Sequence, residues 1–239
     1  MFSQIAGKNA ERLKANPYPG RGIVLGAASD GKKLIQIYWI MGRSENSRNR
    51  VFVRDDDFVR TKAYDESKLT DPSLIIYYPL KAIGNYHIIS NGDQTDTVYD
   101  FLKSGSSFEE ALMSRTFEPD APNYTPRITG IIELNGRNIY SLAIVKTQLG
   151  NPETCVRNFF HYEKPIPGVG HCIHTYAGDG NPLPSFEGEP YLMPVPDSAQ
   201  EALDMYWDLL NPDNRISLLV KTIDIKTGQV EILIKNRHS

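Results

Sequence analysis

Cysteine, net charge and long apolar runs are all scarce in this chain of 239 residues. Its two cysteines, Cys155 and Cys172, exclude a disulfide framework and fit a reducing compartment. Lys and Arg number 26 against 29 Asp and Glu, so the chain lacks the basic footprint of a nucleic-acid-binding surface. The longest apolar runs, at 34–41 and 74–80, are too short to cross a membrane as helices. The sequence therefore predicts no nucleic-acid partner and no membrane partner.

The remaining composition is that of a folded globular protein, with 40% hydrophobic and 23% charged residues. A chain of this length buries enough apolar surface to need no metal or disulfide for stability. No linker stands out, so we expect one domain spanning residues 1–239. The first 21 residues contain basic side chains but no apolar core of a secretory signal, which predicts a cytoplasmic location.

Strand pairs and helices come in separate blocks along the chain, which predicts an α+β fold with largely antiparallel sheets. We expect strands at 22–26, 33–41, 74–78, 86–90, 127–134, 137–146, 158–162, 215–224 and 229–235. We expect helices at 5–15, 96–105, 107–114 and 198–210. Ser107 and Glu110 have the spacing of a capping box at the start of one helix. Segments 42–50, 119–126 and 165–196 are predicted to be loops.

The segment 42–50 has the densest polar chemistry in the sequence. Arg43, Arg48 and Arg50 lie among small hydrogen-bonding residues such as Ser44, directly after an apolar strand. A guanidinium group matches the oxygens of phosphates and carboxamides. A solvated surface loop is the alternative, but the position beside a strand end favours a binding site.

A glycine turn follows the strand at 86–90. It contains Asn91 and Gly92 and leads into a helix, whose first backbone N–H groups can bind an anion. The same residues also suit plain helix capping by Asp93 or Thr95. The sequence leaves these two interpretations equally open.

The segment 117–127 collects carboxylate, amide, phenol and guanidinium groups in one proline-stiffened loop. Glu118, Asp120, Asn123 and Arg127 are its candidates for chemistry. Prolines restrict the backbone and so orient neighbouring side chains in advance. A stiff connector with a surface ion pair explains the composition equally well.

No metal-binding motif is present. His171 and Cys172 are adjacent in a predicted strand, which places their side chains on opposite faces. The patterns HExxH, paired CxxC and EF-hand are absent, and the run of aspartates at 55–57 is typical of a solvated turn. We therefore expect no metal and no cofactor.

Several of these separated motifs together resemble the archaeal-type IMP cyclohydrolase family. The resemblance covers most of the chain. It rests on segments that match the family in type, order and spacing: 19–21, 43–48, Tyr77, Gly84, 90–92, 95–96, Glu118, Asp120 and 123–128. Several motifs in the right order are more specific than any one of them.

The resemblance implies a four-layer αββα sandwich, similar to the fold of N-terminal nucleophile hydrolases. It also implies an enzyme that converts 5-formamidoimidazole-4-carboxamide ribonucleotide to IMP and water, without a metal or cofactor. By resemblance the catalytic residues are Arg48, Tyr77 and Glu118. By resemblance and residue type the substrate-binding candidates are Arg21, Arg43, Ser44, Asn91, Gly92, Asn123 and Arg127. The expected partner is a small purine ribonucleotide, and the sequence leaves a homo-oligomer open.

The chain departs from the family pattern in four places. Residues 1–19 form an N-terminal extension, the loop near Asn123 is one residue longer, and the segment 165–196 is longer. A further arginine, Arg50, competes with Arg48 for the catalytic position. Two other functions remain open: an amidohydrolase of related fold, which needs a nucleophile at a mature N-terminus, and a purine-nucleotide-binding module without catalysis.

Overall fold

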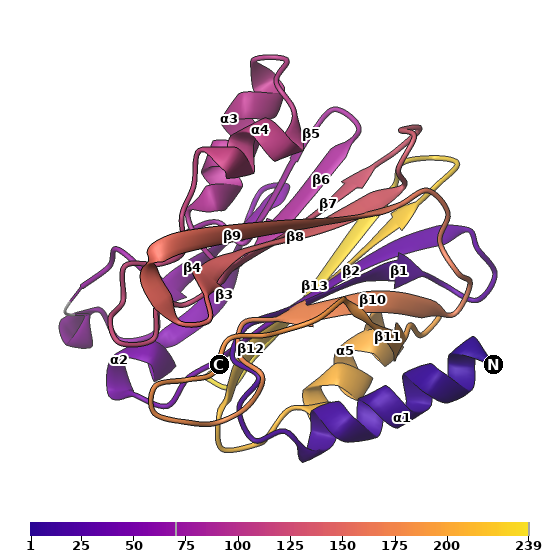
Figure 1. The fold of residues 1–239 in the computed structure, drawn as a ribbon. Coiled ribbons are helices and arrows are strands. Elements are labelled where there is room, and N and C mark those ends of the chain that lie inside the picture. Colours follow the sequence, from indigo (N-terminus) through magenta and orange to yellow (C-terminus); the bar gives the residue numbers. More distant parts are fainter. Residues whose placement is uncertain (70, 239) are drawn as a thin grey trace.

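The chain folds around two antiparallel β-sheets that pack face to face (Figure 1). The computed structural model describes residues 1–69 and 71–238. The first sheet contains, in spatial order, β11 (Tyr191–Pro194), β10 (Val169–His174), β1 (Gly22–Ala27), β2 (Lys33–Met41), β12 (Arg215–Asp224) and β13 (Val230–Asn236). The second contains β3 (Arg50–Asp55), β4 (Phe58–Ala63), β5 (Leu80–Ile83), β6 (Tyr86–Ser90), β7 (Arg127–Glu133), β8 (Tyr140–Gln148) and β9 (Asn151–Tyr162).

Helices cover the outer face of each sheet and complete four layers (Figure 1). α1 (Phe2–Ala15) and α5 (Ala199–Leu209) pack on the first sheet, whereas α3 (Gln94–Lys103) and α4 (Phe108–Met113) pack on the second. Two short helices lie in connections between strands: α2 (Glu45–Arg48) and η1 (Glu66–Lys68). This αββα arrangement confirms the predicted α+β sandwich.

The two faces of each inner strand enter different cores. On β2, Leu34, Tyr38 and Ile40 point toward the second sheet, while Ile35 and Trp39 pack beneath the helices. Every residue of β1 is buried, as expected for a strand covered on both faces. The space between the sheets is therefore an interior layer, and a polar group placed there needs a partner.

Turn and cap signals predicted several boundaries correctly. Gly84 and Asn85 form the two-residue turn between β5 and β6, and Gly84 has a positive φ of 56°. The Ser107 side chain accepts from the backbone N–H of Glu110, and the Glu110 carboxylate accepts from that of Ser107. The capping box predicted at the start of α4 is thereby confirmed.

The prediction of a continuous loop at 42–50 is wrong. The Ser44 side chain accepts a hydrogen bond from the backbone N–H of Ser47 and caps the short helix α2. Strand β3 then begins at Arg50. Local hydrogen bonds of the serines thus create a helical turn inside a segment whose composition is typical of loops.

The strand predicted at 74–78 is also wrong. The carbonyl of Pro72 accepts backbone hydrogen bonds from Ile75 and Ile76, so the chain turns there and pairing begins only at Leu80. Ile75 and Tyr77 are buried without entering a sheet ladder. A short apolar run does not by itself distinguish a strand from a buried turn.

Three further strand regions differ from the prediction. β3 and β4 form a hairpin that the sequence pattern did not reveal, and the aspartates at 56–57 form its turn. β9 starts at Asn151 rather than 158. The predicted loop at 165–196 contains β10 and β11, because this segment pairs with β1 at the edge of the first sheet.

The helix α1 belongs to the packed structure. Its buried face presents Ala6, Ala10 and Leu13, and the last two belong to the core beneath the first sheet. Among the described residues, no helix is both long enough and apolar enough to cross a membrane.

Candidate functional site

A small cavity of about 240 Å³ opens where several strand ends meet at one edge of the sandwich. It is lined by residues that precede β1 or β7, follow β2 or β10, or begin β3. Of the residues predicted to bind substrate, Arg21, Arg43, Ser44 and Asn123 line this cavity. These segments lie far apart in sequence, so only the antiparallel pairing brings them together.

Arg21 lines the small cavity and forms an ion pair with Glu118, which, like Tyr77, is buried and does not itself line the cavity. The Glu118 carboxylate is 1% exposed and accepts a hydrogen bond of 3.3 Å from Nη1 of Arg21. Burial raises the pKa of Glu118, although the charges of Arg21 and Arg127 act in the opposite direction. The result is a carboxylate that takes up a proton more readily than an exposed glutamate.

Tyr77 belongs to the same buried cluster. Its hydroxyl lies 2.7 Å from the hydroxyl of Tyr38, and its backbone N–H donates to Oγ1 of Thr61. Burial raises the pKa of Tyr38 well above the ordinary value for tyrosine. Tyr77 is near enough to Arg21 and Arg50 to act on the pKa of both guanidinium groups. The structure thus brings Tyr77 and Glu118 together around Arg21.

Arg48 lies elsewhere. Its Nε donates to the carbonyl of Gly42 and its Nη2 to the side-chain oxygen of Asn214, and it does not line the small cavity. Arg48 ends α2, where these local acceptors satisfy its guanidinium group. These contacts connect α2 to Gly42 and to Asn214, so in this structure Arg48 stabilises the segment around α2.

Arg50 occupies the position that the sequence left ambiguous. It lines the small cavity, is 1% exposed, and its Nε donates to the carbonyl of Ser47. Its Nη1 and the Nε of Arg21 are buried without a hydrogen-bond partner among the described residues. Burial lowers the pKa of Arg50. The period-two pattern from Phe52 back to Arg50 is the signal that indicates its inward orientation.

Three predicted binding residues, Asn91, Gly92 and Arg127, do not line the small cavity and have structural contacts near Glu118. Nη1 of Arg127 donates to Asp93 at 2.6 Å, and the Asn91 side chain bonds to the backbone before and within β7. A Cβ added to Gly92 would lie 2.9 Å from Nη1 of Arg127 and 3.4 Å from Oε1 of Glu118. Gly92 therefore permits the close approach of these two groups.

At the mouth of the cavity, the charge of Arg43 is already matched. Its Nη1 contacts the carboxylate of Asp179 and donates to the carbonyl of Gly180 at 3.2 Å. The guanidinium group also lies over the ring of Tyr18, 4.9 Å from its centre. Asp179 comes from the segment between β10 and β11, which thereby closes over this edge.

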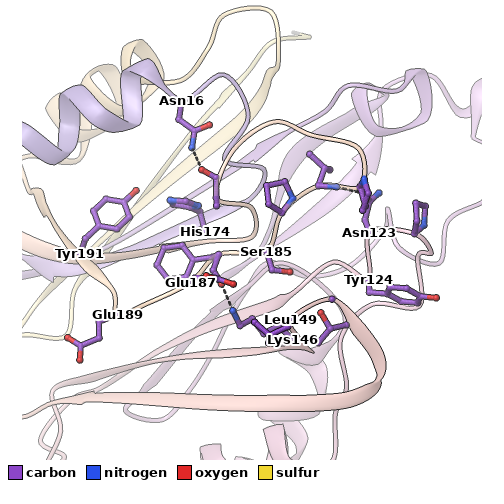
Figure 2. Close-up of a pocket in the computed structure, with 18 of the residues that line it drawn as sticks. Asn16, Asn123, Tyr124, Lys146, Leu149, His174, Ser185, Glu187, Glu189 and Tyr191 are labelled. Atoms are coloured by element: carbon purple, nitrogen blue, oxygen red, sulfur yellow. Dashed lines mark hydrogen bonds between the residues drawn. The ribbon is translucent and has the colours of Figure 1, made fainter.

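A larger cavity of about 720 Å³ adjoins the small one (Figure 2). Asn123 and Leu183 line both, and the side-chain oxygen of Asn123 accepts from the backbone N–H of Leu183. Figure 2 shows His174 and Tyr191 on the side of α1 and Lys146, from β8, on the opposite wall. The volume falls within the roughly 300–1,000 Å³ typical of ligand pockets.

Metal-ligand residues do not cluster in this part of the molecule. Within residues 1–69 and 71–238, no group of three or more His, Cys, Asp or Glu side chains has the arrangement of a metal site. Cys172 packs beneath the helices, while Nδ1 of His171 lies 2.7 Å from the hydroxyl of Tyr140 in the second sheet. Their predicted placement on opposite faces is confirmed.

The sequence from residue 18 to residue 228 matches the model of the family described as IMP cyclohydrolase-like protein. The chain belongs to this family. The match includes every residue of the cluster around Arg21, whereas α1 precedes it. The family predicted from the separated motifs is confirmed.

Individual members of the family are moderately similar. An IMP cyclohydrolase of Methanopyrus kandleri is 30% identical over 164 residues, 67% of this chain and 75% of the relative. One of Methanococcus aeolicus is 30% identical over 122 residues, 49% of this chain and 59% of the relative. One of Methanococcus maripaludis, strain C7, is 32% identical over 120 residues, which are 48% of this chain and 58% of the relative. The matches to the two Methanococcus proteins thus cover less than two thirds of their length.

Proposed function

We propose that this chain is an IMP cyclohydrolase, which converts 5-formamidoimidazole-4-carboxamide ribonucleotide to IMP and water in purine biosynthesis. The observation that carries the proposal is the buried cluster of Tyr77 and Glu118 with Arg21 and Arg50, whose guanidinium groups retain N–H groups without partners. Buried donors of this kind favour a ligand with carbonyl oxygens. Membership in the family and the relatives named IMP cyclohydrolase support the same activity.

The reaction suits a site that orients and moves protons. The carboxamide nitrogen and the formyl carbon belong to one molecule, so holding them in contact removes most of the entropic barrier. The nitrogen is a weak nucleophile and needs to lose a proton as it attacks. We assign this proton to Glu118, because burial raises the pKa of its carboxylate toward that of an effective base.

The formyl oxygen gains negative charge during the attack and needs donors. We assign its protonation to the Tyr77 hydroxyl and its charge stabilisation to the free N–H of Arg50. The resulting carbinolamine then loses this oxygen as water when the ring becomes aromatic. Arg50 thus takes the role that the resemblance suggested for Arg48. Arg21 holds Glu118 in place.

The proposed site belongs to a single domain. We propose that residues 1–239 act as one domain in the cytoplasm, with residues 1–19 as an extension that covers the first sheet. The residues of the cluster come from segments of the chain that lie far apart in sequence.

The direct test is ultraviolet detection of IMP formation from the formylated ribonucleotide by purified protein, with and without a chelator. We expect turnover that the chelator does not change. IMP binding without turnover would favour a nucleotide-binding module, and loss of turnover that zinc or manganese restores would contradict the proposed proton chemistry. Release of ammonia from amide substrates, without IMP formation, would favour an amidohydrolase.

A further inference from the structure

The small cavity does not hold a whole ribonucleotide. Its volume of about 240 Å³ lies below the roughly 300–1,000 Å³ of typical ligand pockets. A substrate whose reacting ring lies beside Glu118 therefore extends either past Arg43 into solvent or past Asn123 into the larger cavity. The shared lining residues Asn123 and Leu183 make the second route continuous with the first.

The cations around the two cavities differ in their partners. Arg21 is paired with Glu118 and Arg43 with Asp179, so both charges are matched within the protein. Arg50 is enclosed beside the reacting groups. A phosphate at Arg43 has to displace Asp179 before it gains a charge-assisted hydrogen bond. The mouth of the small cavity is therefore a poor phosphate site as it stands.

Lys146 is different. Its ammonium group donates a 2.6 Å hydrogen bond to the carbonyl of Phe186, a neutral acceptor (Figure 2). No carboxylate forms an ion pair with it among the described residues, although Glu187 is near enough for its charge to act. A partly buried ammonium group that retains two N–H donors favours an anion beside it.

Other residues that line the larger cavity can bind the ribose and the phosphate of the substrate. The Ser185 hydroxyl faces the same cavity as Lys146, and Arg12 adds a second cation at its edge (Figure 2 shows Ser185 and Lys146). The side-chain oxygen of Asn123 accepts a hydrogen bond from the backbone N–H of Leu183. Its side-chain N–H groups remain available to a ligand where the two cavities meet. Lys146 and Arg12 are thus the cations among the residues that line the larger cavity, whose lining also contains the carboxylates of Glu187 and Glu189, and Asn123 lies where the two cavities meet.

We propose that the larger cavity receives the ribose 5′-phosphate of the substrate and that Lys146 is the cation that binds the phosphate. The inference rests on the proposed function, because it names where the tail of that substrate lies. It assigns the phosphate contact to Lys146 rather than to Arg21, Arg43 or Arg127, the arginines that the sequence suggested as substrate-binding residues. The ligand chemistry is that of a phosphate monoester, which carries close to two negative charges at neutral pH.

The test compares IMP with inosine, which lacks the phosphate, by calorimetric titration of the full chain. Lys146→Met keeps the aliphatic stem and removes the charge, so we expect it to weaken IMP binding by about 10- to 100-fold. Inosine binding should change less than about twofold, because the lost contact is to the phosphate. Lys146→Arg should retain most of the IMP affinity. Lys103→Met, on the outer helix α3, is the matched control and should change neither ligand.

A second variant removes a negative charge near Lys146 instead of the positive charge of Lys146 itself. Glu187→Gln removes the carboxylate whose charge acts on Lys146, so IMP should bind about two- to fivefold more tightly and inosine unchanged. The inference is overturned if Lys146→Met weakens IMP and inosine equally, or if Arg43→Met alone causes the phosphate-dependent loss.

Failure of the proposed function has a different signature. If the wild-type chain binds neither IMP nor inosine, the proposed function fails. The anion site then stands only if inorganic phosphate raises the melting temperature of the wild type and not of Lys146→Met. Equal stabilisation of both proteins by phosphate overturns the anion site as well.

Discussion

Two polar clusters lie between the sheets, on the same face of β2. Tyr38 joins the cluster of Tyr77 beside the small cavity. Two residues earlier on the strand, Gln36 donates to the carbonyl of His87, whose Nδ1 lies 2.8 Å from Nζ of Lys221. The second cluster lines neither cavity of the candidate site.

The clusters share buried groups without partners but differ in charge balance and access. Among the described residues, Nε of Arg21 and Nη1 of Arg50 are buried without a hydrogen-bond partner, and so are Nε2 of His87 and Oε1 of Gln36. An unpartnered polar atom alone therefore does not identify a ligand site. The first cluster contains the ion pair of Glu118 with Arg21, and Arg21 lines the small cavity, whereas Lys221 lies beside the neutral imidazole of His87 and lines neither cavity. We therefore expect the first cluster to control turnover and the second to control stability.

The largest expected effect is a difference in kcat between variants of the first cluster and a variant of the second. Tyr77→Phe and Glu118→Gln should each lower kcat by roughly 10²- to 10⁴-fold, the usual range for general acid–base catalysis. Lys221→Met should leave kcat within about threefold, because it changes no group in contact with the cavity. Steady-state kinetics on variants with confirmed folding measure the contrast. Near-normal kcat in both site variants would remove the distinction between the clusters.

A smaller effect distinguishes the two arginines. Arg50→Lys keeps the charge but loses the planar fork, so kcat/KM should fall by roughly 10- to 100-fold. Arg48→Lys should change it less than about threefold, since Arg48 bonds to Gly42 and Asn214 outside the cavity. The same assay measures both. The reverse order would return the catalytic role to Arg48.

The pH dependence of turnover sharpens the assignment of Glu118. A base works only when deprotonated, so kcat should fall about tenfold per pH unit below its pKa. Burial raises that pKa, so the decline should begin above the ordinary value for glutamate, about 4.3. The pH–rate profile of Glu118→Gln should lack this limb. An identical limb in the variant would assign it to another group.

The last prediction concerns the contribution of the second cluster, Gln36, His87 and Lys221, to the stability of the fold. Burial lowers the pKa of Lys221 to about 7, although the charge of Asp57 acts in the opposite direction. Burial also lowers the pKa of His87 to about 3, so its ring is neutral. Between pH 7 and about 10.4 the unfolded chain binds more protons than the folded chain, so stability should rise with pH.

The rise should be at most about 1.4 kcal/mol per pH unit, and the penalty should be complete below pH 7. Urea unfolding of the wild type and of Lys221→Met at several pH values measures it as a difference. Parallel pH dependence in the two proteins would show that Lys221 stays protonated in the fold.

Much of the fold could be predicted because its signals are local. The hairpin through Gly84 and the capping box at Ser107 rest on residues within a few positions of each other. The hairpin of β3 and β4 was not apparent, because its strands are only partly buried and lack a clear apolar pattern. The turn at 72–76 was misassigned because burial there comes from tertiary packing rather than from pairing.

The sequence by itself determined the family and the α+β class, and it singled out Tyr77 and Glu118 as catalytic candidates, since separated motifs carry that information in their order. Only the tertiary structure placed Arg50 rather than Arg48 at the small cavity, paired Arg43 with Asp179, and placed Lys146 beside the larger cavity. Arg43 and Asp179 lie 136 positions apart. Such pairs depend on which strand ends meet at one edge of the sandwich, and no local pattern of residue types encodes that meeting.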